Sequence, residues 1–196
     1  MKGYMISRNK LIYIGIGTAA LVLIGVGWHL YQKSFYDPDF KPNRILIDPT
    51  YHFQLTAPAG WRFLNIPNSI LNYPKSAAQL VQDGRKAFCV LIPEAIDEEN
   101  RQITLEDFRN AVVDAIKKEN QDAVFESKEK LPSSWSERMR MVYTSTYTLL
   151  KIKWLIQLDL TKSTAYRTIC WCESKDFSRN ETSFKALCDS FQLSQK

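Results

Sequence analysis

The amino-acid sequence predicts an α+β domain with a mainly antiparallel sheet and flanking helices, preceded by a single transmembrane helix. Several segments alternate apolar and polar residues with the period of two that is typical of half-buried strands. Two other segments place apolar residues three and four positions apart, as on one face of a helix. A separate run, residues 11–31, contains no Asp, Glu, Lys or Arg. Strands, a helix, further strands and a closing helix follow one another in the order typical of the α+β class.

The apolar run 11–31 is expected to be an uncleaved membrane anchor. As a helix it is about 31 Å long, which is enough to cross the hydrocarbon core of a bilayer. Trp28 and Tyr31 stand at its end, where aromatic residues of membrane interfaces are common. A buried soluble helix is one alternative. A cleaved signal peptide is the other, but the run is long for its apolar region and no A-x-A site follows.

Charges around the anchor predict its orientation. Basic residues lie on both sides of it, at Lys2, Arg8 and Lys10 and at Lys33, Lys41 and Arg44, so the two flanks are nearly equal. In the reversed topology the basic tail 1–10 would have to cross the membrane. We therefore expect a single-pass protein of the inner (cytoplasmic) membrane, with its N-terminus inside and its globular domain on the periplasmic or lumenal side.

The net charge of +5 belongs mainly to the membrane flank. Four of the 26 basic residues precede residue 35, and all 21 acidic residues follow it, so the remainder of the chain is nearly neutral. This distribution gives no argument for a nucleic-acid partner.

A tether, residues 32–50, leads to the globular domain, residues 51–196. The tether contains three prolines and is expected to be extended, with a short edge strand at 45–47. The first clear strand, 51–56, alternates apolar and polar residues and ends at Pro58. Gly60 permits a sharp reversal there, which would fold Trp61 back over the apolar face of the strand.

The later elements are recognised by their periodicity. A loose region is expected up to about residue 77. The elements then expected in order are a buried strand near 86–93, a helix capped by Thr104 with Asp107 completing a capping box, a strand near 123–129, meander strands near 137–148, 152–160 and 165–173, and a closing helix near 178–191.

Four segments together resemble the PsbP/Mog-type fold, which includes PsbP-like photosystem subunits and envelope proteins similar to DcrB and LpqN. They are "YHFQLTAPAGW", "ITLEDFRNAV", "AYRTICWC" and "SFKALCDSFQL", in this order over residues 51–193. The resemblance implies that Trp61 packs on the sheet rather than stacking on a ligand. It also implies an accessory or binding role. The chain departs from the pattern by lacking a glycine near residues 149–153.

No constellation for catalysis is recognisable. The only histidines are His29, within the predicted anchor, and His52, at the start of a strand. No H-E-x-x-H, G-x-S-x-G, P-loop or G-x-G-x-x-G motif occurs. We therefore expect no catalytic, cofactor-binding or metal-binding residues, and a protein that is not an enzyme.

The meander is rich in aromatic residues. Trp135, Tyr143, Tyr147 and Trp154 are the candidate partner-binding residues, because not all of the aromatic side chains there can point into one core. This hypothesis requires one lightly covered face of the sheet. The alternative, in which helices cover both faces, stays open at the level of the sequence.

The four cysteines permit either free thiols or one disulfide. Cys170 and Cys172 would point to the same face of a strand, so they cannot easily bond to each other. Cys188 lies on the inward stripe of the closing helix. A bond from Cys172 or Cys170 to Cys188 is the candidate disulfide, and free thiols are the default expectation.

Two functions remain. The first is a membrane-anchored, non-catalytic interaction or assembly module that acts on a membrane protein complex in the cell envelope. The second is an envelope protein that binds a small ligand in a pocket between sheet and helix. The resemblance favours the first, with a protein partner and no nucleic acid, whereas the sequence does not identify a small-molecule ligand.

Overall fold

The computed structural model describes residues 45–64, 75–82, 86–97 and 102–194. The predicted anchor, 11–31, and most of the tether lie outside these ranges. Within them, no helix is both long enough and apolar enough to cross a membrane.

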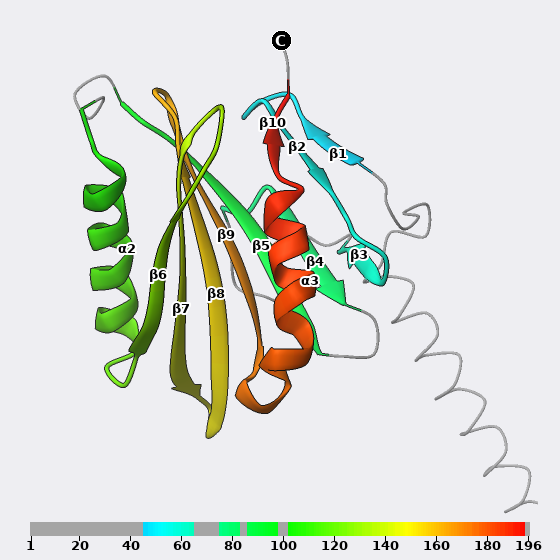
Figure 1. Ribbon diagram of the computed structural model, residues 1–196, viewed down its shortest axis with the longest axis vertical. Helices are drawn as coiled ribbons and strands as arrows, with labels where there is room; N and C mark the ends of the chain where they lie inside the picture. Colours follow the sequence, from blue (N-terminus) through cyan, green and yellow to red (C-terminus); the bar gives the residue numbers. More distant parts are fainter. Residues whose placement is uncertain (1–44, 65–74, 83–85, 98–101, 195–196) are drawn as a thin grey trace, which may run out of the picture.

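Two antiparallel sheets and two helices make up the domain (Figure 1). The small sheet has the order β1-β2-β10, from β1 (Ile45–Asp48), β2 (Phe53–Thr56) and β10 (Gln192–Leu193). The large sheet has the order β3-β4-β5-β9-β8-β7-β6. Its strands are β3 (Trp61–Phe63), β4 (Ala78–Gln82), β5 (Ala87–Ala95), β6 (Val124–Leu131), β7 (Glu137–Tyr147), β8 (Leu150–Leu160) and β9 (Thr164–Glu173). The predicted α+β class with a mainly antiparallel sheet is confirmed.

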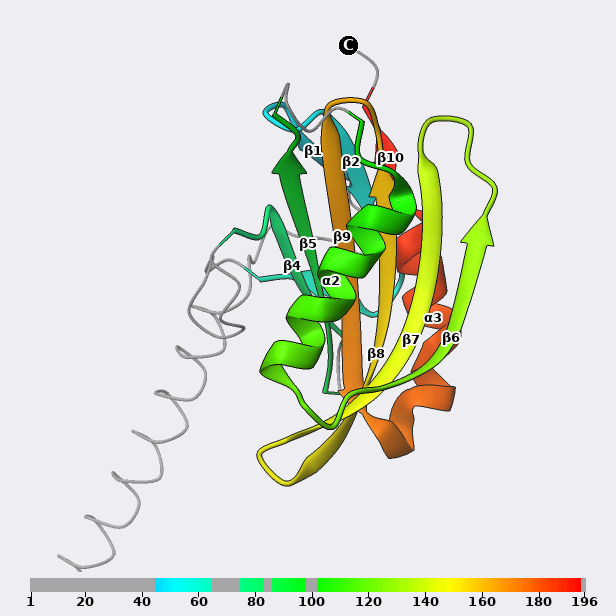
Figure 2. The same cartoon turned by 90° about the vertical axis from the view of Figure 1, so that its left-hand side faces the viewer.

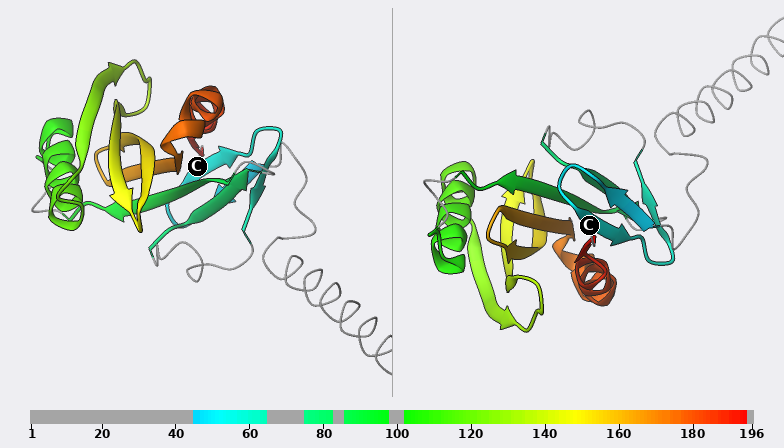
Figure 3. Two further views of the ribbon diagram at one scale, coloured as in Figure 1. Left: turned by 90° about the horizontal axis from the view of Figure 1, so that it is seen from below. Right: turned by 90° about the horizontal axis from the view of Figure 1, so that it is seen from above.

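Helices α2 (Leu105–Glu119) and α3 (Phe177–Asp189) cover opposite faces of the large sheet (Figure 3). The helix expected from the capping signal begins where predicted, since Thr104 and Asp107 form the reciprocal capping box. A short 3-10 helix, η2 (Ser174–Asp176), leads into α3. The meander strands β7, β8 and β9 agree with their predicted positions, whereas β3, β4 and β10 were not expected.

The Pro58–Gly60 corner folds as the sequence predicts. The backbone N–H of Trp61 donates to the Pro58 carbonyl at 3.1 Å, and Gly60 has a φ of +80°, which suits a residue without a side chain. Trp61 is 1% exposed, and its ring lies 6.0 Å from that of Phe184 on α3. Its indole N–H donates to Ser183 Oγ at 2.9 Å. The expectation that Trp61 is a core residue is confirmed.

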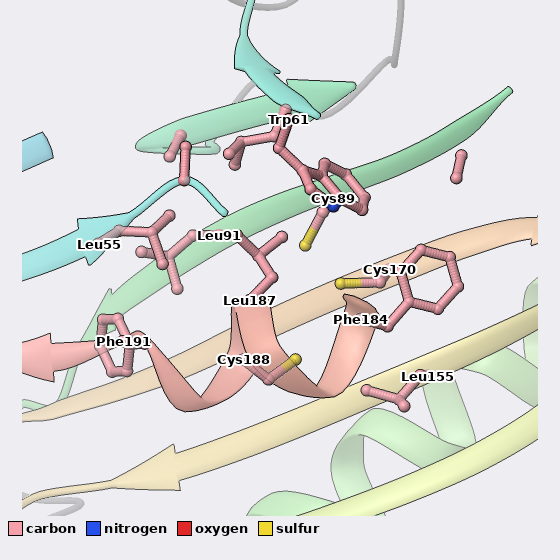
Figure 4. Packing of buried hydrophobic residues seen from close by; sticks show 14 of the residues in the cluster. Leu55, Trp61, Cys89, Leu91, Leu155, Cys170, Phe184, Leu187, Cys188 and Phe191 are labelled. Carbon is pink, nitrogen blue, oxygen red and sulfur yellow. The ribbon is translucent and has the colours of Figure 1, made fainter. Parts of the chain in front are cut away.

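Two clusters of buried side chains lie on the two faces of the sheet. The α3 side joins Phe184, Leu187 and Phe191 to Trp61 and Leu55, and Figure 4 shows these side chains converging between helix and strands. The α2 side is formed by buried apolar residues of β5, of the meander strands and of the inner face of α2. Both helices therefore pack directly on the sheet through filled interfaces.

The β7–β8 hairpin has an unusual turn. Tyr147 pairs with Leu150, so the loop consists of Thr148 and Leu149 alone. Both loop residues have positive φ, +46° and +71°. Two-residue loops of this kind usually contain Asn and Gly, since a left-handed backbone costs other residues roughly 1–2 kcal/mol each. The missing glycine noted in the sequence is thus replaced by two residues that the turn does not favour.

Candidate partner-binding surface

One ring from each of five neighbouring strands forms a continuous aromatic ladder across the large sheet. The register places Phe125 opposite Tyr143, Tyr143 opposite Trp154, Trp154 opposite Trp171, and Trp171 opposite Phe88. Successive ring centroids are 5.3 to 5.6 Å apart. All four contacts are stacked, and the planes of Tyr143 and Trp154 differ by only 3°. We call these five residues the aromatic ladder.

The ladder lies on the α2 face of the sheet, beside the C-terminal half of that helix. Tyr143 is buried, whereas Phe88, Phe125, Trp154 and Trp171 are half-buried. Lys117 in the last turn of α2 places its Nζ 6.0 Å from the centre of the Phe125 ring. A helix thus lies on each face of the sheet, as in the alternative left open by the sequence, but α2 covers only part of the ladder and leaves aromatic surface accessible on four of its five rings.

Polar contacts hold the surroundings of the ladder in place. The indole N–H of Trp154 donates to Ser145 Oγ at 3.0 Å, which fixes the orientation of this ring. The Thr146 backbone N–H donates to Asp122 Oδ2 at 2.7 Å and ties the α2–β6 loop to the hairpin. Hydrogen bonds from Thr146 lower the pKa of Asp122, so this carboxylate remains charged well below neutral pH.

The four candidate residues named from the sequence separate into three environments. Tyr143 and Trp154 are neighbours in the ladder. Tyr147 lies on the same face of β7 but is 67% exposed at the hairpin tip. Trp135 lies on the other side of the sheet, where its ring contacts Phe191 at 5.3 Å and Arg138 stacks over it at 4.9 Å.

Sequence reasoning missed the two outer members of the ladder, Phe88 and Phe125, and did not select Trp171. Each stands on a strand that was expected, so alternation alone assigns each ring to a face of its own strand. The missing information was the pairing of β5 with β9, which brings together residues 88 and 171.

The opposite face carries a buried polar network instead of an aromatic surface. Asp159, which is 0% exposed, accepts hydrogen bonds from Arg138 Nε at 2.6 Å, Ser136 Oγ at 2.9 Å and Gln157 Nε2 at 3.0 Å. Burial raises the pKa of Asp159, although the bonds from Arg138 act in the other direction. Gln157 also donates to the carbonyl of Cys188, so the network fastens α3 to the sheet.

The four cysteines are free and buried thiols in the structure. Cys170 on β9 lies directly opposite Cys89 on β5, and its thiol also interacts with that of Cys188 (Figure 4). Cys172 interacts instead with Asn180, eight residues before Cys188 on α3. Of the two candidate partners for Cys188, the fold thus brings Cys170 into contact and directs Cys172 elsewhere.

These thiols are poor candidates for nucleophiles. Burial raises the pKa of Cys89 and Cys170 and brings that of Cys172 to about 11, and a hydrogen bond with Cys170 together with burial raises that of Cys188. Since the thiolate is the reactive form, all four remain unreactive at neutral pH. His52, which directly precedes β2, is an exposed turn residue with a φ of +52°.

No protein-family model and no curated protein sequence matches the chain. Solved structures do match, at low sequence identity. A cyanobacterial PsbP (CyanoP) from Synechocystis has a TM-score of 0.60 at 12% identity, over 80% of this chain and 96% of that one. LpqN of Mycobacterium tuberculosis, described as involved in cell envelope biogenesis, has a TM-score of 0.52 at 9% identity, over 80% of this chain and 88% of that one.

A protein of unknown function from Pseudomonas aeruginosa matches with a TM-score of 0.50 at 9% identity, over 78% of this chain and 97% of its own. The chain therefore has the PsbP-like, LpqN-like fold that its sequence segments resemble. At these identities the likeness establishes the fold alone.

Proposed function

We propose that this protein is a membrane-anchored, non-catalytic interaction module that docks on, or helps to assemble, a membrane protein complex in the cell envelope. The aromatic ladder carries the proposal. Its four half-buried rings, together with the buried Tyr143, stand on five neighbouring strands and form a rigid apolar surface whose side chains are already ordered by stacking and by the Trp154–Ser145 hydrogen bond. Binding to such a surface costs little side-chain entropy.

Aromatic side chains are also the residues that contribute most to binding at protein interfaces. The accessible parts of the half-buried Trp154 and Trp171 fit an aliphatic side chain of a partner. The neighbouring structures agree with a role of this kind, since one is a PsbP and another is described as acting in envelope biogenesis. A small-ligand function receives less support, because side chains fill the interface between α3 and the sheet.

The proposed location is the inner membrane, with the anchor 11–31 retained and the domain outside. Protease added to cells whose outer envelope has been opened is expected to degrade the domain. Degradation only after lysis of the inner membrane would contradict this topology. Release of the full chain by alkaline extraction would contradict the anchor itself.

The docking surface can be tested by photocrosslinking in intact membranes. The aromatic crosslinker p-benzoyl-phenylalanine in place of Phe88 keeps a ring at the end of the ladder and is expected to give a discrete crosslinked protein. Tyr51 provides a matched control, because it is a half-buried aromatic residue in the other core cluster. The control position is expected to give no crosslink to the same protein.

The partner is then identified by purification in mild detergent and mass spectrometry. Phe88→Ala is expected to lower the recovery of the crosslinked protein strongly, and Tyr51→Ala to leave it unchanged. Equal recovery from both variants would contradict docking through the ladder. If no protein co-purifies and a small molecule alone raises the melting temperature, the ligand-binding function replaces the proposed one.

A further inference from the structure

The tip of the β7–β8 hairpin is the most exposed apolar feature of the described domain. Among the described residues, six large apolar side chains are exposed. Four of them gather at this end: Leu149 at 96%, Tyr147 at 67%, Val124 at 62% and Leu150 at 50%. Ile45 and Ile47, at the edge strand β1, are the other two. An apolar cluster at the apex of a hairpin contributes nothing to the core. The surface that covers these side chains therefore lies outside the domain.

The hairpin projects beyond the rest of the domain. In Figures 1 and 2 the turn between β7 and β8 is the outermost point of the described chain at the end opposite β10. The turn presents Leu149 in a left-handed conformation that glycine or asparagine would adopt more easily. An exposed leucine at this position stabilises neither the turn nor the core.

From these features we infer that Tyr147, Leu149 and Leu150 insert into the interfacial layer of an anionic membrane. Leucine and aromatic side chains flanked by lysine are the composition typical of segments that lie at the boundary of headgroups and acyl chains. Lys151 follows Leu150 directly and forms no ion pair within the described part of the chain. Lys117 and Lys118, in the last turn of α2 at the same end, are also exposed, and the exposed Glu119 and Asp122 beside them offset part of this positive charge.

The shape of the tip also favours a lipid surface over a protein partner. Leu149 in the two-residue turn, with Tyr147 and Leu150 beside it, forms a small convex point, whereas the residues that dominate protein interfaces lie in larger, flat or pocketed areas. The membrane is within reach if the proposed anchor is correct, and the inference rests on that proposal. Residues 32–44 can extend to about 45 Å, which exceeds the roughly 35 Å length of β7.

The test uses the full chain in vesicles and a fluorescent label at the tip. A cysteine at position 148 (Thr148→Cys) accepts the label in the folded protein, because the four native thiols are buried. Vesicles contain equal parts of phosphatidylglycerol and phosphatidylcholine, with or without a lipid that carries a nitroxide quencher. The quencher is expected to lower the fluorescence about twofold, since interfacial side chains lie at the depth of the quencher.

A matched label at Lys162→Cys, in the exposed turn between β8 and β9 at the opposite end, is expected to keep its intensity. Adding Leu149→Asn to the Thr148→Cys protein is expected to abolish quenching without lowering the melting temperature, because asparagine accepts the left-handed backbone. Lys151→Gln is expected to reduce the difference in quenching between these anionic vesicles and vesicles of phosphatidylcholine alone.

Equal fluorescence at position 148 with and without the quencher lipid would overturn the inference, as would equal quenching at positions 148 and 162. Shielding of the label only after a partner protein is added would assign the tip to a protein interface and also overturn it. Alkaline extraction of the same vesicles distinguishes a missing hairpin contact from a failed anchor. A chain that resists extraction but shows no quenching contradicts the hairpin contact alone.

Discussion

Trp61→Ala is expected to lower the free energy of unfolding by about 3–5 kcal/mol, the usual cost of removing a buried tryptophan. The indole is 1% exposed, packs against Phe184 and donates its N–H to Ser183. In a domain of this size each kcal/mol shifts the melting temperature by about 2–4 °C, so the expected loss is near 10 °C. Calorimetry or circular dichroism of the full chain in detergent measures it.

Two further variants separate packing from hydrogen bonding at this site. Trp61→Phe retains much of the apolar contact and is expected to cost less than half as much as Trp61→Ala. Ser183→Ala removes the acceptor of both Trp61 and Gln82 and is expected to cost about 1 kcal/mol. A Trp61→Ala protein that melts like the unchanged chain would contradict the role of the corner as a core element.

Arg138→Met is expected to destabilise the domain by about 3–5 kcal/mol at neutral pH. The arginine Nε lies 2.6 Å from Asp159 Oδ1, and both side chains are nearly inaccessible. Removal of the guanidinium leaves a buried carboxylate without its charge partner. Arg138→Met/Asp159→Asn is expected to recover a large part of the loss, because the amide keeps an acceptor for Ser136. Lys185→Met, which breaks the exposed Glu181–Lys185 pair, is the control and is expected to cost at most about 0.5 kcal/mol.

The pH dependence of Arg138→Met provides an independent check. Without the arginine, the pKa of Asp159 rises further in the folded state than burial already raises it. Between the unfolded pKa and this raised value, the folded variant binds a proton that the unfolded chain lacks. The variant therefore gains stability as the pH falls through that window, and its deficit is largest at neutral pH. A deficit that grows on acidification would contradict an uncompensated carboxylate as the cause.

The parts of the fold that could be predicted are those with local signals. The capping box at Thr104 fixes the start of α2, and alternation along 152–160 identifies β8 and the side chains that face α2. The strand β4 was missed because Gln79 and Gln82 are buried polar residues that hide its apolar character. Strands β3 and β10 are too short for any periodicity to appear.

The candidate surface was only partly predictable for a different reason. Alternation places Tyr143 and Trp154 on one side of their strands, but stacking across five strands depends on the register of four separate pairings. Trp135 has no such strand neighbour and packs on Phe191 instead. Likewise, Gln157 and Asp159 resemble a solvent-facing row, and only the return of α3 onto that face makes them a buried network.

The pairing of β10 with β2 also bears on when the domain can finish folding during synthesis. Gln54 on β2 and Gln192 on β10 form a side-chain hydrogen bond and are separated by 138 residues in the sequence. At about 5–20 residues per second, ribosomes need roughly 7–30 s to make that interval. Until then one edge of β2 lacks its partner, and Ser194 cannot donate to the His52 carbonyl. The small sheet therefore cannot close before nearly the whole described chain has been made.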